Sequence, residues 1–308
     1  MKQLRYFDAA LRTGSIARAA VELNISQSSI TAAIDIIEQV ARAELFRRMP
    51  AKGIVPTDIG ISVGERIREF LEQARVFESD ILTLAGNPAG TLRLGCYAPC
   101  APYVLPPILK RISSHFPEMG IELKEGDMHT ISDLLSSGRI DLALTYRREI
   151  KKSLPFVALF QATPIAFIPT AWPLAKQNEV NLAELVERPM VLLDLPGARP
   201  YFSGLFEAQG LRPRIAHTTK SSSVLRCLVA ANFGYALMNI CGPNDRAGQD
   251  GYVVRHIRGD HDSPQFGVAF SRASRRSALA KAMLVTCRDI SSRGGFKHIV
   301  DPVCSGAN

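Results

Sequence analysis

The sequence has few of the residues that build disulfide-rich proteins or metal sites. Its six cysteines are scattered along 308 residues, at Cys96, Cys100, Cys227, Cys241, Cys287 and Cys304. This distribution argues against a disulfide framework, and reduced thiols are usual in the cytosol. No Cys-x-x-Cys occurs, and His256 and His261 are not four positions apart, the spacing that places two zinc ligands on one helix face. We therefore expect no metal site and no cofactor.

The chain also lacks long hydrophobic runs and the common enzyme motifs. No apolar run approaches the about 18 residues of a membrane span, and the opening MKQLRYFDAALRTG has no apolar core of the kind a signal peptide needs. The patterns G-x-S-x-G, G-x-G-x-x-G and G-x-x-x-x-G-K-[ST] are missing as well. These absences predict a cytoplasmic protein without a membrane partner, and they give no support to an enzyme.

The composition is that of a folded protein with a modest positive charge. Hydrophobic residues make up 46% of the chain, enough to bury the cores of more than one domain. Lys and Arg number 37 against 29 acidic residues, a net charge of +8 that is compatible with a polyanionic partner. Residues 1–60 carry only about +2 of it, so an N-terminal DNA-binding domain would have a weak electrostatic footprint.

Three helical patterns fill the first 41 residues. Leu4, Phe7 and Leu11 have helical spacing, and Ser15 is a good N-cap for a second helix over 16–23. Asn24 and Ile25 form a tight turn, and Ser26 caps a third helix. That helix carries apolar residues on its inner side, at Ile30, Ala33, Ile34, Ile37 and Ala41. Two helices joined by so short a turn predict a helix-turn-helix.

The other face of the third helix is polar, with Gln27, Ser28, Thr31 and Asp35 on one side. Small polar side chains at a helix N-terminus suit a DNA major groove, where glutamine can recognise adenine and hydroxyls can meet bases or phosphates. The alternative is a solvated face without a partner.

A longer helical pattern follows, with apolar residues at alternating steps of four and three. Its members are Val63, Ile67, Phe70, Ala74, Phe77, Ile81 and Leu84. This spacing predicts a coiled-coil seam and hence a dimer; the alternative is an amphipathic helix packed on its own domain. The segment 86–90, GNPAG, is typical of a hinge or linker.

Beyond residue 90, strand-like and helix-like stretches alternate, as in an α/β sheet with crossover helices. The predicted strands are 92–97, 121–124, 142–146, 165–168, 190–193, 215–219, 235–239 and 266–270. The predicted helices are 102–114, 131–136, 201–209, 222–231 and 277–290. Residues 291–308 are predicted to form a loose tail.

Several of these segments resemble the LysR-type transcriptional regulators. The segments that match the family are LRYFDAALRTGSIARAAVELNISQSSITAAIDIIEQ, ELFRR, KGIVPTDIG, the run GRIDLAL at 138–144 and WPLA at 172–175. The resemblance implies an α/β fold class with an N-terminal winged helix-turn-helix (1–58), a long linker dimerisation helix (59–86) and a two-lobed, periplasmic-binding-protein-like effector domain (91–300). Lobe I would span about 91–163 and 265–295, and lobe II about 164–264.

The resemblance also implies partners and site residues. The partners are double-stranded DNA, a small-molecule effector and further copies of the chain in a homodimer or homotetramer, with RNA polymerase as a candidate further partner. The residues matching the family's DNA contacts are Ser26, Gln27, Ser28, Thr31, Arg48 and Lys52. The chain departs from the family at Ala32, a position that is often basic, and Asp35 adds a negative charge nearby.

Effector residues are expected at the carboxyl ends of strands and at helix starts, where a two-lobed fold holds its ligand. The candidates are Tyr97, Ala98, Pro99, Cys100, Ala101, Thr145, Tyr146, Arg147, Arg199, Tyr201, Ser221, Ser222, Ser223 and Asn239. Arg147 or Arg199, together with the serine-rich helix start, would suit a carboxylate effector; alternatively both arginines are surface groups.

Cys96 and Cys100 leave a further question open. Four residues apart at the expected cleft, they suggest a redox or electrophile sensor, or a nucleophile in an enzyme, but each is equally explained as a small buried residue. A solute-binding receptor is a third class, which the DNA-binding pattern of residues 1–85 opposes. The leading prediction is a DNA-binding regulator that senses a small molecule and has no enzymatic activity.

Overall fold

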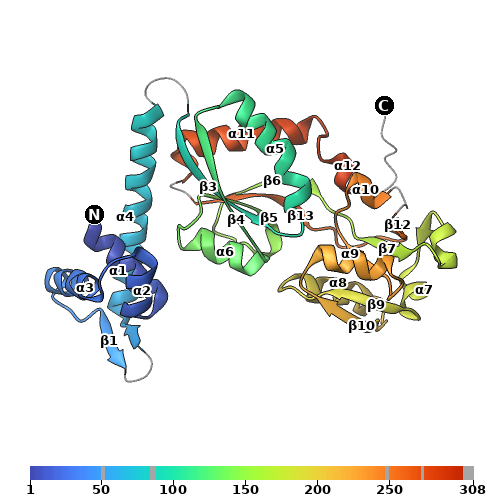
Figure 1. The fold of residues 1–308 in the computed structure, drawn as a ribbon, viewed down its shortest axis with the longest axis horizontal. Coiled ribbons are helices and arrows are strands. Elements are labelled where there is room, and N and C mark those ends of the chain that lie inside the picture. Colours follow the sequence, from blue (N-terminus) through green and yellow to red (C-terminus); the bar gives the residue numbers. More distant parts are fainter. Residues whose placement is uncertain (50–52, 84–87, 247–249, 272–273, 301–308) are drawn as a thin grey trace. The chain divides into compact units, whose positions relative to one another are not determined.

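The computed structural model describes residues 1–49, 53–83, 88–246, 250–271 and 274–300 (Figure 1). It divides into two compact units, Met1–Ile81 and Leu82–Asn308, each with its own core. Lys52, Leu84, Cys304 and the start of the predicted 86–90 hinge lie outside the described residues. No helix in the described ranges is long and apolar enough to cross a membrane.

The first unit is a winged helix-turn-helix. Its elements are α1 (Lys2–Thr13), α2 (Ile16–Leu23), α3 (Gln27–Ala41), β1 (Phe46–Met49), β2 (Gly53–Pro56) and α4 (Asp58–Thr83). Ser15 and Ser26 cap α2 and α3 by accepting hydrogen bonds from the backbone N–H groups of Arg18 and Ser29. Asn24 has the left-handed conformation predicted for the turn, with φ of 52°. The helix-turn-helix prediction is therefore confirmed, although Ala41, expected inside, is exposed.

Helix α4 uses its apolar stripe in two ways. Ile67 is buried in the core of the winged unit, and Val63 and Leu71, one turn away on either side, pack against that core. Phe70, Phe77 and Ile81 are 51%, 65% and 49% exposed. The uniform seam predicted from the heptad spacing is therefore divided, because Val63 and Ile67 already cover the winged unit.

Lobe I of the second unit is built on a five-stranded sheet with the order β4-β3-β5-β13-β6. The strands are β3 (Gly90–Tyr97), β4 (Met119–Gly126), β5 (Leu142–Tyr146), β6 (Phe156–Gln161) and β13 (Gln265–Phe270). Strands β3, β4 and β5 are parallel, and β13 runs antiparallel to β5 and β6. Helices α5 (Ala101–His115) and α11 (Ala278–Ser292) cover one face and α6 (Met128–Ser136) the other (Figure 1).

Lobe II has a sheet of the order β11-β7-β12-β8, which a single bridge between Met190 and Tyr235 joins to the parallel pair β9 and β10. Its strands are β7 (Ile165–Pro169), β8 (Glu179–Val180), β9 (Pro189–Leu193), β10 (Arg214–Thr219), β11 (Ala236–Met238) and β12 (Tyr252–Ile257). Its helices are α7 (Leu182–Val186), α8 (Ala198–Glu207), α9 (Ser222–Ala230) and α10 (Pro243–Arg246). Short 3₁₀ helices lie at η1 (Arg147–Glu149), η2 (Pro173–Lys176) and η3 (Ser274–Arg276).

The chain passes between the lobes twice, after β6 and after β12, and the two crossings lie side by side. The backbone N–H of Ala162 in the first crossing donates to the carbonyl of Pro264 in the second, at 3.0 Å. Two adjacent extended crossings form a natural hinge for lobe movement.

The α/β alternation is confirmed, and two expectations need correction. Strands β6, β8 and β12 were not predicted. The sequences of β8 and β12 mix polar and apolar residues, whereas β6 is a short apolar run, FVALFQ, that periodicity alone does not assign to a strand. The expected loose tail is wrong over its first part. It contains α12 (Lys297–Val300), and Phe296 and Ile299 are buried in the main core, which fixes the chain up to that helix.

Candidate effector cleft and recognition helix

The start of α3 presents a compact polar surface. Ser26 Oγ lies 2.8 Å from Ser28 Oγ and 2.9 Å from Ser29 Oγ, and Thr31 Oγ1 donates to the backbone carbonyl of Gln27 at 3.1 Å. Gln27 and Ser28 are exposed, whereas Thr31 is half-buried. These hydroxyls are already engaged locally, which leaves the Gln27 amide as the longest polar group directed away from the helix.

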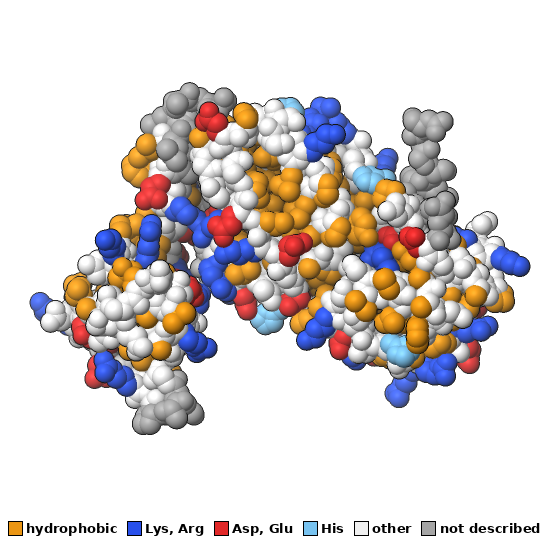
Figure 2. All heavy atoms as spheres, in the orientation of Figure 1, with side chains coloured by type: hydrophobic (Ala, Val, Ile, Leu, Met, Phe, Trp, Pro, Cys, Tyr) orange, Lys and Arg blue, Asp and Glu red, His pale blue; other side chains and the backbone are white. Residues whose placement is uncertain are grey.

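The wing adds Arg48, an exposed residue on β1 that pairs with Ile54 of β2. Lys52 lies outside the described residues. On the face of the winged unit that Figure 2 shows, basic side chains are spread around the rim and are not gathered in one patch. This spread agrees with the small net charge of the segment and implies weak nonspecific attraction to DNA.

The cleft between the lobes is narrow and largely apolar. It is lined by Tyr97, Pro99, Cys100, Met128, Tyr146, Arg148, Leu193, Gly197, Ala198, Tyr201, Phe202, Met238, Asn239, Ile240 and Pro264. The enclosed space measures about 20 Å³, room for roughly one water molecule. The lobes are thus nearly closed on each other here.

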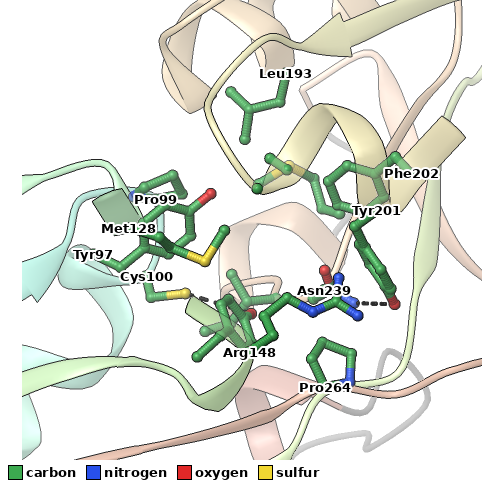
Figure 3. A pocket seen from close by; sticks show the side chains of 15 residues that line it. Tyr97, Pro99, Cys100, Met128, Arg148, Leu193, Tyr201, Phe202, Asn239 and Pro264 are labelled. Carbon is green, nitrogen blue, oxygen red and sulfur yellow. Dashed lines mark hydrogen bonds between the residues drawn. The ribbon is translucent and has the colours of Figure 1, made fainter. Parts of the chain in front are cut away.

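Arg148 bridges the two lobes across this cleft. It belongs to η1 of lobe I, and its guanidinium lies 4.3 Å from the ring centroid of Tyr201, on α8 of lobe II. The same guanidinium donates to Asp262 Oδ2 at 2.5 Å, in the crossing between β12 and β13. Figure 3 shows Arg148 extended toward Asn239 and Tyr201, beside Pro264. A cation–π contact therefore joins the two lobes across the cleft, and the pair with Asp262 holds the guanidinium in place beside it.

Asn239 and Tyr201 form a fixed polar pair at the base of the cleft. Asn239 Nδ2 donates to the hydroxyl of Tyr201 and to the carbonyl of Ala162, both at 3.0 Å, and the Tyr201 hydroxyl donates to the carbonyl of Asp262 at 2.8 Å. Burial raises the pKa of Tyr201 to about 12, so its hydroxyl is neutral at physiological pH. Both crossings between the lobes are thereby tied to lobe II.

The cysteines of the cleft are buried thiols. Cys100 Sγ donates to the Tyr146 hydroxyl at 3.6 Å, and burial raises the pKa of Cys100 to about 12. Burial also raises the pKa of Cys96 well above its ordinary value. A reactive cysteine must be a thiolate, so these pKa values favour the interpretation of both residues as core side chains. No cluster of potential metal ligands occurs among the residues that the structure covers.

Comparison with known families decides the identity of the fold. Residues 1–61 match the family of bacterial regulatory helix-turn-helix proteins of the lysR type, and residues 85–291 match the LysR substrate binding domain. The chain belongs to the LysR family of transcriptional regulators.

Individual LysR relatives cover most of the chain. The HTH-type transcriptional regulator TtuA of Agrobacterium vitis is 27% identical over 77% of this chain and 79% of its own length. The RuBisCO operon transcriptional regulator of Allochromatium vinosum is 24% identical over 92% and 93%. Among solved structures, HinK of Pseudomonas aeruginosa has a TM-score of 0.62 and 27% identity, covering 94% of this chain and 97% of its own. All three are named as transcriptional regulators.

The LysR effector signature at 138–144 has a structural role. Asp141 accepts hydrogen bonds from the backbone N–H of Arg93 at 2.8 Å and from its guanidinium at 3.0 Å. Arg93 also donates to the carbonyl of Gly138, whose φ of 66° suits glycine. Burial raises the pKa of Asp141, although Arg93 opposes the shift. This pair fixes the start of β5 against β3, away from the cleft.

The structure gathers six of the predicted effector residues at the cleft, namely Tyr97, Pro99, Cys100, Tyr146, Tyr201 and Asn239. Ala98 and Ala101 belong to the adjoining turn and the start of α5 without lining the space. Thr145 is buried on the opposite side of β5 from Tyr146, and its hydroxyl has no hydrogen-bond partner among the described residues.

The predicted arginines and serines lie elsewhere. Arg147 donates to the carbonyls of Leu154 and Lys152, and Arg199 is 46% exposed and paired with Asp194 at 2.6 Å. Ser221, Ser222 and Ser223 begin α9, where Ser221 accepts a hydrogen bond from the N–H of Val224. None of these five residues lines the cleft.

Sequence reasoning missed Arg148, Met128, Phe202, Met238 and Pro264. Arg148 lies in η1, which begins directly after β5, so the alternation of side chains along a strand does not predict which of the two arginines faces the cleft.

Proposed function

We propose that this LysR regulator recognises specific DNA through α3 and changes its DNA binding when a small molecule enters the cleft between lobes I and II. The observation that carries the effector part is the closure of the cleft by Arg148. A ligand needs only to bind one lobe spacing better than the other to shift the equilibrium between them. No chemical reaction is required.

Self-association is the second part of the proposal. The exposed Phe70 and Phe77 of α4 favour a homodimer through the linker helix, and pairs of dimers would give a homotetramer. Two tethered winged units bind a double site far more tightly than one, which offsets the small charge of each unit. The proposal includes a cytoplasmic location and contact with RNA polymerase at the promoter.

Gln27 provides the sharpest test of DNA recognition. We expect Gln27→Ala to weaken binding to the preferred site by about 1–3 kcal/mol and to relax base preference at one position. Arg48→Ala should weaken binding to all sequences alike and lower the salt slope by about one, because a wing arginine meets phosphate. Fluorescence anisotropy would compare a duplex from upstream of the chain's own gene with a scrambled duplex.

Gln39→Ala is the matched control, because Gln39 is an exposed glutamine at the far end of the same helix. It should leave both affinities unchanged. Equal losses on the two duplexes for Gln27→Ala would show that Gln27 does not recognise a base. Wild-type chain that does not distinguish the duplexes would contradict recognition of this site.

A further inference from the structure

The chemistry of the cleft wall restricts what can bind there. Most of the lining is aliphatic or aromatic, and none of the residues that line the cleft itself is acidic, whereas Asp262, the partner of Arg148, and Glu149, beside Gly197, lie next to it. Met128 from lobe I faces Phe202 and Leu193 from lobe II (Figure 3). Such a surface complements a flat or compact apolar molecule, and methionine adapts to its shape.

Several hydrogen-bond donors of the cleft are already used within the protein. Asn239 uses both amide hydrogens on Ala162 and Tyr201, and the Tyr201 hydroxyl already donates to Asp262. The Tyr146 hydroxyl receives the thiol of Cys100. Arg148 differs, because its partner Asp262 is 70% exposed and an ion pair with so exposed a carboxylate is weak.

We propose that the effector is an apolar, preferably aromatic, molecule with a single carboxylate, which replaces Asp262 as the partner of Arg148. The proposal rests on the proposed effector role of the cleft. The ligand's carboxylate would form charge-assisted hydrogen bonds with a guanidinium that is already positioned over the cleft. Its apolar body would occupy the space between Met128 and Phe202.

The same wall disfavours a second carboxylate. It would lie among Met128, Leu193 and Phe202 without a cation to meet it, and an unpaired buried charge is costly. Dicarboxylates are therefore expected to bind poorly.

Entry of such a ligand must move the lobes. The cleft encloses about 20 Å³, whereas a cavity of about 150 Å³ is known to hold benzene. The ring of Tyr201 and the guanidinium of Arg148 occupy the path between the lobes, so Arg148 must leave Tyr201 or carry lobe I away from it. Exchange of Asp262 for the ligand would thus couple binding to lobe spacing.

The test uses the full chain and three small probes. Benzoate has the aromatic body and the single carboxylate of the proposed ligand. Benzamide is its neutral analogue, and succinate is a dicarboxylate with little apolar surface. Isothermal titration should show benzoate binding at least about tenfold more tightly than either of the others, the size of effect expected for a charged hydrogen bond. Equal or weaker binding of benzoate would overturn the ligand class.

Two variants test the exchange at Arg148. Arg148→Gln should remove the preference for benzoate over benzamide. Asp262→Asn should strengthen benzoate binding several-fold, because it removes the internal competitor while leaving the backbone carbonyl that Tyr201 uses. Arg199→Gln is the matched control, since Arg199 is likewise paired with an aspartate but lies outside the cleft. Weaker benzoate binding in Asp262→Asn would contradict the exchange.

The location of the bound ligand and its effect on DNA binding are measured separately. Ala198→Trp, which fills the cleft, should abolish benzoate binding, and binding that survives it would place the ligand elsewhere. DNA affinity measured with and without benzoate then tests the function of the cleft. Benzoate that binds in the cleft without changing DNA affinity would contradict the proposed function but not the ligand class. If a probe of a different chemical class binds in the cleft and changes DNA affinity, the ligand class is contradicted but the proposed function is not.

Discussion

Asp245 on α10 is a residue at which the two lobes are joined. It accepts hydrogen bonds from Arg226 of α9 at 2.8 and 3.2 Å, from the Tyr252 hydroxyl at 2.6 Å and from the backbone N–H of Gly242 at 2.6 Å. The hydroxyl of Tyr103, from α5 of lobe I, reaches it at 3.3 Å. Burial opposes ionisation of Asp245, but the bonds from Arg226, Tyr252 and Gly242 lower its pKa overall. It is therefore an ionised, buried partner of Arg226.

We expect Asp245→Asn to destabilise the lobed unit by about 3–5 kcal/mol, because the variant leaves Arg226 buried and unpaired. Tyr103→Phe, which removes one outlying bond, should cost about 1 kcal/mol or less. Chemical denaturation at neutral pH measures both. A loss for Asp245→Asn as small as that for Tyr103→Phe would show that the pair contributes little.

The pH dependence of the same variant has a definite sign. The folded-state pKa of Asp245 lies below its unfolded value. The ionised carboxylate therefore contributes its full share to the free energy of unfolding above the unfolded pKa of about 3.9. That contribution to stability is lost as the pH falls through the lower folded pKa. The stability difference between wild type and Asp245→Asn should therefore be constant near neutrality and shrink only in acid.

At the scale of elements, α4 shows where sequence patterns lose information. Its heptad spacing predicts a helix and an apolar stripe, and both are present. The spacing cannot tell which stretch covers the chain's own winged unit and which meets another molecule, because both need the same apolar side chains. Arg68 pairs with Asp8 of α1 at 3.2 Å, which marks the first half as the part docked on its own unit.

The exposed aromatic residues of α4, Phe70 and Phe77, should therefore govern self-association. We expect Phe70→Glu to convert the dimer to monomers without unfolding the winged unit, because Phe70 lies outside its core. Gln73→Glu, one turn along the helix at another exposed position, adds the same charge and should leave the dimer intact. Sedimentation velocity distinguishes the two outcomes. Dimers that persist in Phe70→Glu would place the main self-association surface elsewhere.

The lining of the candidate effector cleft was predictable in part, for a related reason. Strand ends and helix starts located Tyr97, Cys100, Tyr146, Tyr201 and Asn239, since those positions follow from topology. Met238 and Phe202 could not be chosen, because an apolar residue at a cleft has the same local pattern as one in a core. Pro264 comes from a chain crossing far along the sequence, and only the folded hinge brings it to Arg148.

At the scale of the whole molecule, the chain contains two separate cores. Among the described residues, the core of the winged unit is drawn from residues 4–71, whereas the cores of the lobed unit are drawn from residues 92–300. The two family matches, 1–61 and 85–291, fall on either side of the same division. Stability should accordingly be partitioned between the units, since changes at distant sites without shared partners add independently.

A pair of matched core variants can test this independence. Phe7 is fully buried in the winged unit, with its ring centroid 5.1 Å from that of Phe46, and Phe206 is fully buried in lobe II. Each Phe→Ala change should cost about 3–5 kcal/mol in its own unit. In calorimetry of the full chain, Phe7→Ala should lower one thermal transition and abolish DNA binding while the other transition stays in place. Phe206→Ala should lower only the second transition and leave binding of the upstream duplex measurable at temperatures below it. If either variant lowers both transitions together, the units unfold as one, and a change in lobe spacing would then reach the winged unit through shared stability rather than through a shift between two folded arrangements.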